Sequence, residues 1–336
     1  MNRCRTSRGR TLLHVAALLG AIVVGLGLLT GNAMAATVLT LVTFDRAAGQ
    51  TPESVAITTD GTAYVSLAFA GQIRRITPNG GQATLTMPTA GGITVGVAID
   101  AHHDNDLDVA VRSAAPNAAG IWRVPRVGFD HPTRIAALPT VSFPNGVTFD
   151  ADGNLYVADS DLGRIWRLAR GASQATVWAQ GPLLSPTGES FQGFVLPGAN
   201  GLKIRGKTLY VSNTSTQTII AIPIRRDGTA GSMAVRFSGV QIDDFAFAVN
   251  GDLYATENPP SRLVRITPCG VVSTVATATD GLENPSDVAF DPRPAHRRDL
   301  LVTNSAYFGT TPAFRSSQPG ESVNAFHDER PPHEYR

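Results

Sequence analysis

This sequence of 336 residues has little cysteine and no large excess of positive or negative charge. It also lacks the motifs of several common enzymes. The only two cysteines, Cys4 and Cys269, exclude a scaffold held together by several disulfides. The 28 basic and 27 acidic residues nearly balance, which argues against nucleic acid or an anionic membrane surface as partners. No phosphate-cradling glycine loop, no Gly-x-Ser-x-Gly elbow and no zinc helix motif is found.

Residues 1–35 have the pattern of a signal peptide. A start rich in arginine precedes an apolar run over residues 12–29, and Ala33-Met34-Ala35 forms a small-x-small cleavage site before Ala36. We therefore expect a secreted, periplasmic or cell-envelope protein with no membrane attachment after cleavage. The alternative is an uncleaved signal anchor, because the apolar run approaches the ~20 residues that span a bilayer.

Copies of one pattern fill the rest of the chain. Each copy has a short apolar strand, a turn rich in Asp and Gly, and a second strand with a Leu-Tyr-Val type core, as in PNGVTFDADGNLYVADS from Pro144. Equivalent positions in successive copies are 42 to 55 residues apart and hold Glu53, Val95, Asn145, Asn200, Asp243 and Ser286. A period of about 40 to 50 residues with four short strands predicts an all-β, six-bladed β-propeller. Unrelated hairpins in a β-sandwich, the alternative, would not repeat at this period.

The last copy lacks a fourth strand, and the segment TVLTLVTF from Thr37 has the pattern to supply it. Pairing of the two ends would close the ring and remove its open edges. The predicted organisation is a signal peptide (1–35), a propeller (36–314) and a polar C-terminal tail (315–336). In this tail, SVNAFHDE from Ser322 could form the third strand of the last blade.

The equivalent positions predict a metal site. The first strand of each propeller blade lines the central channel, so the marker residues are expected to face one another near its mouth. Two carboxylates and two carboxamides there suit calcium or another divalent cation, which binds oxygen, and the absence of sulfur and His argues against zinc or copper. Asn-Gly and Asp-Asp are also common in turns, and a one-residue bulge would substitute Asp244 for Asp243. The predicted metal ligands are Glu53, Asn145, Asn200 and Asp243.

This register of Glu, Asn, Asn and Asp resembles the gluconolactonase, senescence-marker-protein and luciferin-regenerating-enzyme family of six-bladed propellers. Diisopropyl fluorophosphatase and the paraoxonases are similar in the same four ligand types. The resemblance implies one catalytic divalent cation, usually calcium, and hydrolysis of lactones or phosphoesters. In the sugar-lactonase members the middle Asn is followed by Asp and preceded two residues earlier by Arg, whereas this chain has Gly146 and Phe143 there. Gluconolactone itself is therefore not the expected substrate.

We accordingly predict a monomeric hydrolase of small lactones, esters or phosphoesters. Asp243 is the predicted general base or nucleophile, and Glu53 the predicted pure ligand. Ser286 could donate a hydrogen bond to the substrate. The long connection 181–198, with Phe191 and Phe194, resembles a lid and suggests an apolar or aromatic substrate. The residues that end the second strands are expected to surround the site: Asp159, Asn213, Asn258 and Asn304. The competing hypothesis is a non-catalytic propeller that presents its loops to a protein or glycan.

Overall fold

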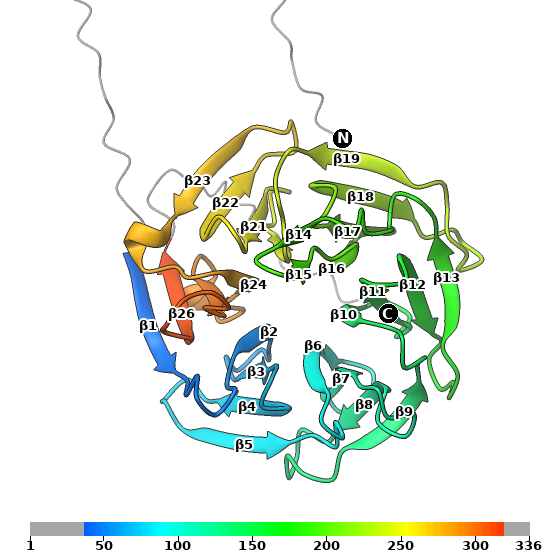
Figure 1. The fold of residues 1–336 in the computed structure, drawn as a ribbon, viewed down its shortest axis with the longest axis horizontal. Coiled ribbons are helices and arrows are strands. Elements are labelled where there is room, and N and C mark those ends of the chain that lie inside the picture. The colour runs from blue at the N-terminus through cyan, green and yellow to red at the C-terminus, as the bar shows by residue number, and fades with distance from the viewer. Residues whose placement is uncertain (1–36, 319–336) are drawn as a thin grey trace, which may run out of the picture.

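The computed structural model describes residues 37–318, which form a ring of six four-stranded antiparallel sheets around a central axis (Figure 1). The predicted six-bladed β-propeller is thus confirmed. Blade one contains β2 (Pro52–Ile57), β3 (Ala63–Leu67), β4 (Gln72–Ile76) and β5 (Gln82–Thr86). Blade two contains β6 (Ile93–Asp100), β7 (Asp106–Arg112), β8 (Gly120–Val124) and β9 (Thr133–Ala137). Blade three contains β10 (Pro144–Phe149), β11 (Leu155–Asp159), β12 (Arg164–Leu168) and β13 (Thr176–Gln180).

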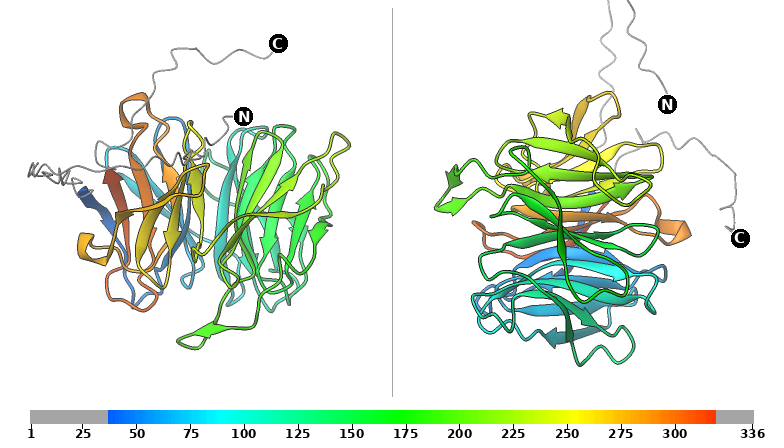
Figure 2. Two further views of the ribbon diagram at one scale, coloured as in Figure 1. Left: turned by 90° about the horizontal axis from the view of Figure 1, so that it is seen from above. Right: turned by 90° about the vertical axis from the view of Figure 1, so that its right-hand side faces the viewer.

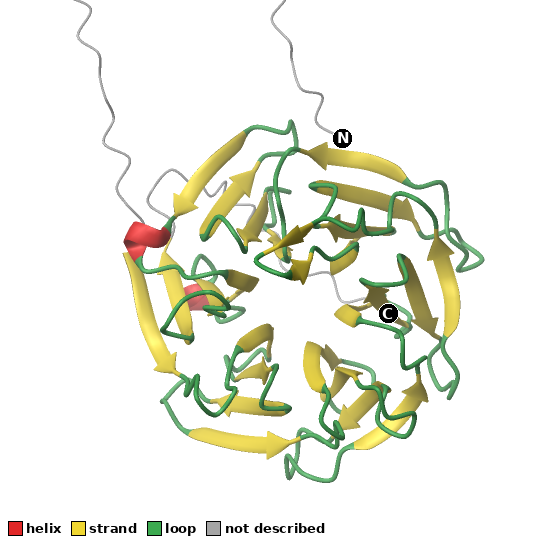
Figure 3. Ribbon diagram, in the orientation of Figure 1, coloured by secondary structure: helices red, strands yellow, loops and turns green. Residues whose placement is uncertain are grey.

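A two-stranded hairpin, β14 (Ser190–Phe191) and β15 (Phe194–Val195), follows blade three. Blade four contains β16 (Ala199–Arg205), β17 (Thr208–Asn213), β18 (Thr218–Pro223) and β19 (Ala234–Ser238). Blade five contains β20 (Phe245–Phe247), β21 (Leu253–Glu257), β22 (Arg262–Ile266) and β23 (Val272–Ala276). Blade six contains β24 (Pro285–Phe290), β25 (Leu300–Asn304), β26 (Ala313–Gln318) and β1 (Thr37–Thr43). Short 3-10 helices η1 (Ala278–Asp280) and η2 (Pro294–His296) lie in loops (Figure 3).

Blade six is built from both ends of the described chain. Its innermost strand is β24, and β1 pairs antiparallel with β26 at its outer edge. The strand from Thr37 therefore lies where the sequence places it. The third strand, however, is Ala313–Gln318, so the boundary expected after residue 314 falls inside a strand. The segment from Ser322 proposed for this strand, like the predicted signal peptide, lies outside the described residues.

The core lies between neighbouring sheets, which pack face to face around the ring. The second strands are buried along their length, and their successive residues pack into clusters on opposite faces of the sheet, so each blade contributes to clusters shared with its neighbours. Tyr64, Tyr156 and Tyr254 occupy equivalent places in blades one, three and five and are almost completely buried. A fully buried large apolar side chain stabilises a fold by about 1.5 to 3 kcal/mol, so these contacts fix each blade to its neighbours. No helix in residues 37–318 is long and apolar enough to cross a membrane.

Candidate metal centre at the mouth of the channel

Five of the six marker residues line one small cavity in the channel. Glu53 comes from β2, Asn145 from β10, Asn200 from β16, Asp243 from the residues before β20, and Ser286 from β24. The four predicted metal ligands are at most 9% exposed. The remaining marker, Val95 in β6, is apolar and buried. The structure therefore brings together, from blades one, three, four and five, the four oxygen-bearing side chains that the repeat register singled out.

A β-bulge in the first strand aims these side chains at the channel. In blade one, Pro52 pairs with Leu67 and Val55 with Val65, so Glu53 and Ser54 together lie opposite one residue, Ser66. The same shift occurs in blades two, three, four and six. Because a bulge interrupts the alternation of side chains, both residues of the pair can face the channel. The cavity is lined by such pairs, which form an outer layer of marker residues and an inner layer of the residues that follow them.

The strand register decides between the two aspartates of blade five. Phe245 pairs with Ala255 as Val55 pairs with Val65 in blade one. Asp243 therefore occupies the marker position of Glu53, and Asp244 occupies the inner position of Ser54. Both aspartates line the cavity, but only Asp243 contacts another predicted ligand, through the Asn200 amide at 2.5 Å from its Oδ1.

Hydroxyl groups on the second strands of four blades connect each of these blades to the next. Each hydroxyl lies on the second strand of its blade and donates to the main-chain carbonyl of a marker residue in the following blade. The pairs are Ser66 to Val95 at 2.5 Å, Ser212 to Asp243 at 2.7 Å, Thr256 to Ser286 at 2.8 Å, and Thr303 to Glu53 at 3.1 Å. Because the last pair joins blade six to blade one, the marker residues are fixed across the closure of the ring.

A second set of polar groups orients the two carboxamides. The Asn145 amide donates to the Ser160 hydroxyl at 3.3 Å, and that hydroxyl donates to a main-chain carbonyl at 2.8 Å. The Asn200 amide donates to the Thr214 hydroxyl at 2.9 Å, and Thr214 likewise donates to a carbonyl at 2.8 Å. Since both hydroxyl protons are committed to carbonyls, only the NH₂ end of each amide can face its hydroxyl. The amide oxygens are thereby left for the cavity, which is the orientation a cation requires.

Sequence reasoning placed three of the four supporting residues one position too early. Of the four residues expected around the site, only Asn258 contacts a predicted ligand, donating to Asp243 Oδ2 at 2.9 Å. Asp159, Asn213 and Asn304 instead bind main-chain groups of nearby loops. The supporting position directly follows the second strand, and the repeat register would have revealed it, because it holds a polar side chain in blades three to six: Ser160, Thr214, Asn258 and Ser305.

The cavity concentrates negative charge. Burial, opposed by the hydrogen bond that Tyr307 donates and reinforced by repulsion from Asp287 and Asp244, raises the pKa of Glu53 to about 7. Burial and then repulsion from Glu53 raise the pKa of Asp243 well above its usual range, although Asn258 and Asn200 donate to it. A buried carboxylate needs a counter-charge to remain ionised. A divalent cation at the outer layer would supply that charge.

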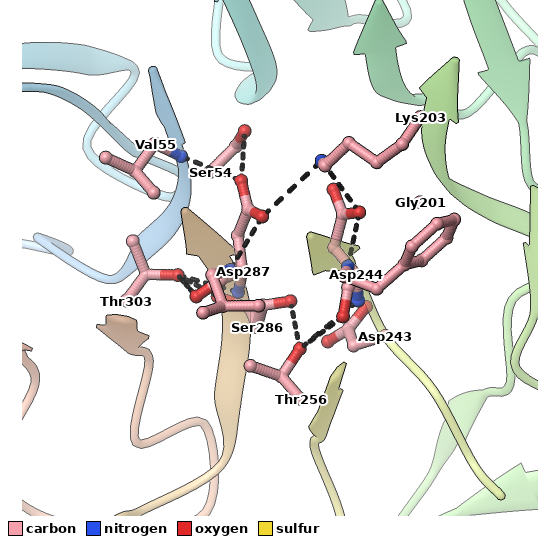
Figure 4. Close-up of polar contacts among 12 residues, drawn as sticks. Ser54, Val55, Gly201, Lys203, Asp243, Asp244, Thr256, Ser286, Asp287 and Thr303 are labelled. Carbon is pink, nitrogen blue, oxygen red and sulfur yellow. Dashed lines mark hydrogen bonds and ion pairs between the residues drawn. The ribbon is translucent and has the colours of Figure 1, made fainter. Parts of the chain in front are cut away.

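The inner layer contains an ammonium group that no sequence pattern predicted. Lys203 extends from β16, and its Nζ lies 2.9 Å from Asp244 Oδ1 and 3.7 Å from Asp287 Oδ1 (Figure 4). Burial and repulsion from Asp287 raise the pKa of Asp244 to about 8, although attraction and a hydrogen bond from Lys203 lower it. Burial would lower the pKa of Lys203, but attraction to the two aspartates prevails and raises it. Lys203 therefore stays protonated.

The residues present fit a hard divalent cation. Two carboxylates and two amide oxygens from the outer layer are the donors that calcium accepts, and they leave positions for water or a substrate. Within residues 37–318, no group of three or more His, Cys, Asp or Glu side chains is arranged to hold a metal ion. The candidate set differs from such groups because two of its four donors are carboxamides.

Ser286 lines the cavity, but its hydroxyl is engaged with the protein. Its Oγ lies 2.7 Å from the main-chain carbonyl of Glu53 and 2.6 Å from the Ser305 hydroxyl. These contacts hold β24 of blade six against β2 of blade one, so Ser286 helps to position Glu53.

The two predicted lid phenylalanines lie on the β14–β15 hairpin, which projects beyond the ring on one side (Figure 2). The rings of Phe191 and Phe194 contact the edge of Phe308, with centroids 5.3 and 5.5 Å apart. Phe308 belongs to the loop between β25 and β26, on blade six, and its neighbour Tyr307 donates to Glu53 Oε2. The hairpin thus reaches a loop that contacts a predicted metal ligand. Sequence reasoning missed Tyr307 and Phe308 because no repeat position marks this loop.

The β25–β26 loop is a firm support for these rings. Arg46 donates to the Tyr307 carbonyl at 3.1 Å, and the Phe308 amide donates to Asn284 at 3.0 Å. Two further amides of the loop donate to Glu283 Oε2 at 3.0 Å each. Phe191 and Phe194 are 38% and 54% exposed, so the aromatic surface at this mouth remains open to solvent.

These features define a six-bladed propeller with an acidic, oxygen-lined channel mouth. A family model for the NHL repeat matches residues 142–168, which span β10 to β12 of blade three. No curated protein matches the sequence.

Several solved propellers share the fold. A gluconolactonase from Xanthomonas campestris is 18% identical, with a TM-score of 0.62, over 84% of this chain and 89% of its own. The calcium-binding protein regucalcin from Agrobacterium tumefaciens is 15% identical, with a TM-score of 0.61, over 84% and 92%. A luciferin-regenerating enzyme is 13% identical, with a TM-score of 0.64, over 84% and 95%. The resemblance to these propellers, expected from the marker residues, is confirmed at the level of the fold.

Proposed function

We propose that this protein is a secreted, monomeric hydrolase of small lactones, esters or phosphoesters that depends on a divalent cation, calcium in the first instance. One observation carries the proposal: Glu53, Asn145, Asn200 and Asp243 line one cavity, and each carboxamide is turned so that its oxygen faces that cavity. The similarity in fold to a gluconolactonase and to the calcium-binding regucalcin supports it.

The outer layer is suited to hold the cation through these four residues. A cation bound there would polarise a carbonyl or phosphoryl oxygen and stabilise the negative charge that develops on it, which is worth several kcal/mol. Glu53 serves as a ligand, because Tyr307 and the contacts of Ser286 hold it in place.

Asp243 is the residue that handles the proton or attacks the substrate. Both of its oxygens are held in position, Oδ1 by Asn200 and Oδ2 by Asn258. With a cation bound beside it, the Asp243 carboxylate would be ionised and could accept a proton from water. Alternatively the carboxylate attacks the carbonyl carbon of an ester or lactone, the C–O bond breaks and the departing oxygen takes up a proton, and water then hydrolyses the acyl intermediate and restores the carboxylate. Asp244 is a weaker candidate, since its Oδ1 binds Lys203 and the Phe245 amide.

The aromatic residues at the mouth favour an apolar or aromatic group on the substrate. Phe191 and Phe194 on the hairpin and Phe308 on the opposite loop present ring edges and exposed apolar surface beside the cavity. In the inner layer, Gly146 adds no polar side chain next to Asn145 that could grip a sugar hydroxyl. We therefore favour aryl or alkyl esters and lactones over sugar lactones.

Two measurements test the proposal. Elemental analysis of the purified protein, with thermal melts before and after a chelator, should show a bound divalent ion whose removal lowers Tm. A panel of lactones, aryl esters and phosphotriesters should then reveal turnover that is lost with the ion and restored by calcium. Bound metal without turnover on any of the three classes would favour the non-catalytic binding propeller, and absence of any bound ion would contradict the metal centre itself.

A further inference from the structure

The inner layer of the channel is arranged around a single amino group. The ammonium of Lys203, from blade four, lies between Asp244 of blade five and Asp287 of blade six (Figure 4). Lys203 and Lys207 are the only lysines of a sequence with 28 basic residues. Arginine thus supplies nearly all positive charge elsewhere, whereas the channel has the more compact ammonium, which acts as a point charge.

The two aspartates are held in place without help from Lys203. Asp287 Oδ1 accepts from the Val288 amide at 2.7 Å, and its Oδ2 accepts from the Ser54 hydroxyl at 3.0 Å and the Val55 amide at 2.9 Å. Asp244 Oδ1 accepts from the Phe245 amide at 2.7 Å. Main-chain donors therefore direct both carboxylates toward the place that the ammonium occupies.

The carboxylates of the channel outnumber its ammonium group, and this affects how many metal ions the channel can bind. Glu53 and Asp243 of the outer layer and Asp244 and Asp287 of the inner layer together present four carboxylates, and Lys203 is the cation among them. Two carboxylates that converge on one point are the core of a site for a hard cation. In this channel that point is taken by a side chain of the protein.

We infer that Lys203 acts as a built-in counter-ion that occupies an inner cation position between Asp244 and Asp287, so that the channel binds one divalent ion instead of two. The inference rests on the proposed metal centre in the outer layer. Lys203 acts there through its charge, because main-chain donors already direct both aspartates toward the ammonium.

The test is the number of calcium ions bound per chain, measured by equilibrium dialysis with elemental analysis on the purified protein and three variants. We expect one ion for the parent and two for Lys203→Met, which removes the charge but keeps an unbranched side chain. Lys203→Arg retains the charge and should still bind one ion. Lys207→Met is the matched control, because Lys207 is exposed in the turn between β16 and β17, and it should also bind one.

Thermal melts give a second readout that does not depend on activity. Lys203→Met should melt below the parent in chelator, and calcium should raise its Tm by more than that of the parent, since two ions then bind only the folded chain. A variant that folds only when calcium is present would equally support the inference. Lys203→Met that binds one ion, or that does not fold even in excess calcium, would overturn it.

The outcomes separate the two proposals. A parent protein with one ion and a folded Lys203→Met with one ion would leave the proposed metal centre standing and refute the role of Lys203. A parent with two ions would also refute that role. A parent with no ion would contradict the metal centre, and a gain of one ion in Lys203→Met would still support an inner cation position.

Discussion

The buried carboxyl group of Glu53 should make the metal-free protein less stable as pH rises, which is the reverse of the usual effect of a carboxyl group. Burial raises its pKa from 4.5 to about 7, so unfolding lets Glu53 ionise at any pH between these values. The folded state therefore loses stability as pH rises from about 4.5 to about 7 and loses no more above that range. A difference of about 2.5 pKa units corresponds to roughly 3 kcal/mol at 1.36 kcal/mol per unit. A bound cation favours the ionised carboxylate and should remove this loss.

Urea unfolding of metal-stripped protein at pH 5, 6, 7 and 8, repeated with calcium, measures the effect. Glu53 should contribute on the order of 3 kcal/mol to the fall in the free energy of unfolding without metal, and the raised pKa values of Asp243 and Asp244 add to that fall. Glu53→Gln is the control, since it cannot ionise and its free energy of unfolding should fall by about 3 kcal/mol less than that of the parent. If the metal-free protein is as stable at pH 8 as at pH 5, and Glu53→Gln behaves like the parent, then the proposed environment of Glu53 is wrong.

Three further predictions concern individual positions. Asp243→Asn should keep the fold and much of the metal binding while lowering ester or lactone turnover by on the order of 10² or more; unchanged turnover on a good substrate would transfer the role to Asp244. Gly146→Ala should lower the free energy of unfolding by about 1 to 3 kcal/mol, because its Cβ would lie 2.5 Å from the Asn200 carbonyl oxygen; a loss below about 0.5 kcal/mol in urea unfolding would show that the strands can separate. Phe308→Ala should raise KM for aryl esters by roughly tenfold but leave methyl esters little changed, since about 1.4 kcal/mol of apolar contact corresponds to a factor of ten; equal effects on both substrates would exclude contact with the aryl group.

The repeat explains how much of this structure could be predicted from the sequence. The first and second strands have a clear pattern of apolar residues and are joined by an Asp-Gly turn. The spacing of these strand pairs predicts the blades and places Glu53, Asn145, Asn200 and Asp243 at equivalent positions. The third strand of blade six escaped prediction because AFRSSQ has little apolar content, and only Ala313 and Phe314 reach the core.

The repeat pattern does not predict contacts between distant segments of the chain. Lys203 meets Asp287 across two blades, 84 positions along the chain, and the identity of neither residue reveals the pair. Phe308 meets the β14–β15 hairpin from the loop between β25 and β26, whose residues lie outside the repeat pattern. Such contacts follow from closure of the ring, whereas the local pattern determines only the individual blade.

The bulge in the first strand of five blades gives the propeller an evolutionary freedom that a regular strand would lack. A bulge can turn two consecutive residues toward the axis, and the hydroxyls of Ser66 and Ser212 on the second strands bind the main-chain carbonyls of marker residues and not their side chains. One member of a pair can therefore be exchanged without disturbing the backbone that presents the other. Val95 illustrates this, since Val95→Asp would add a fifth oxygen donor to the ring from a blade that currently gives none. A lineage, or an engineer, can thus change the ion and the reaction separately while the fold remains the same.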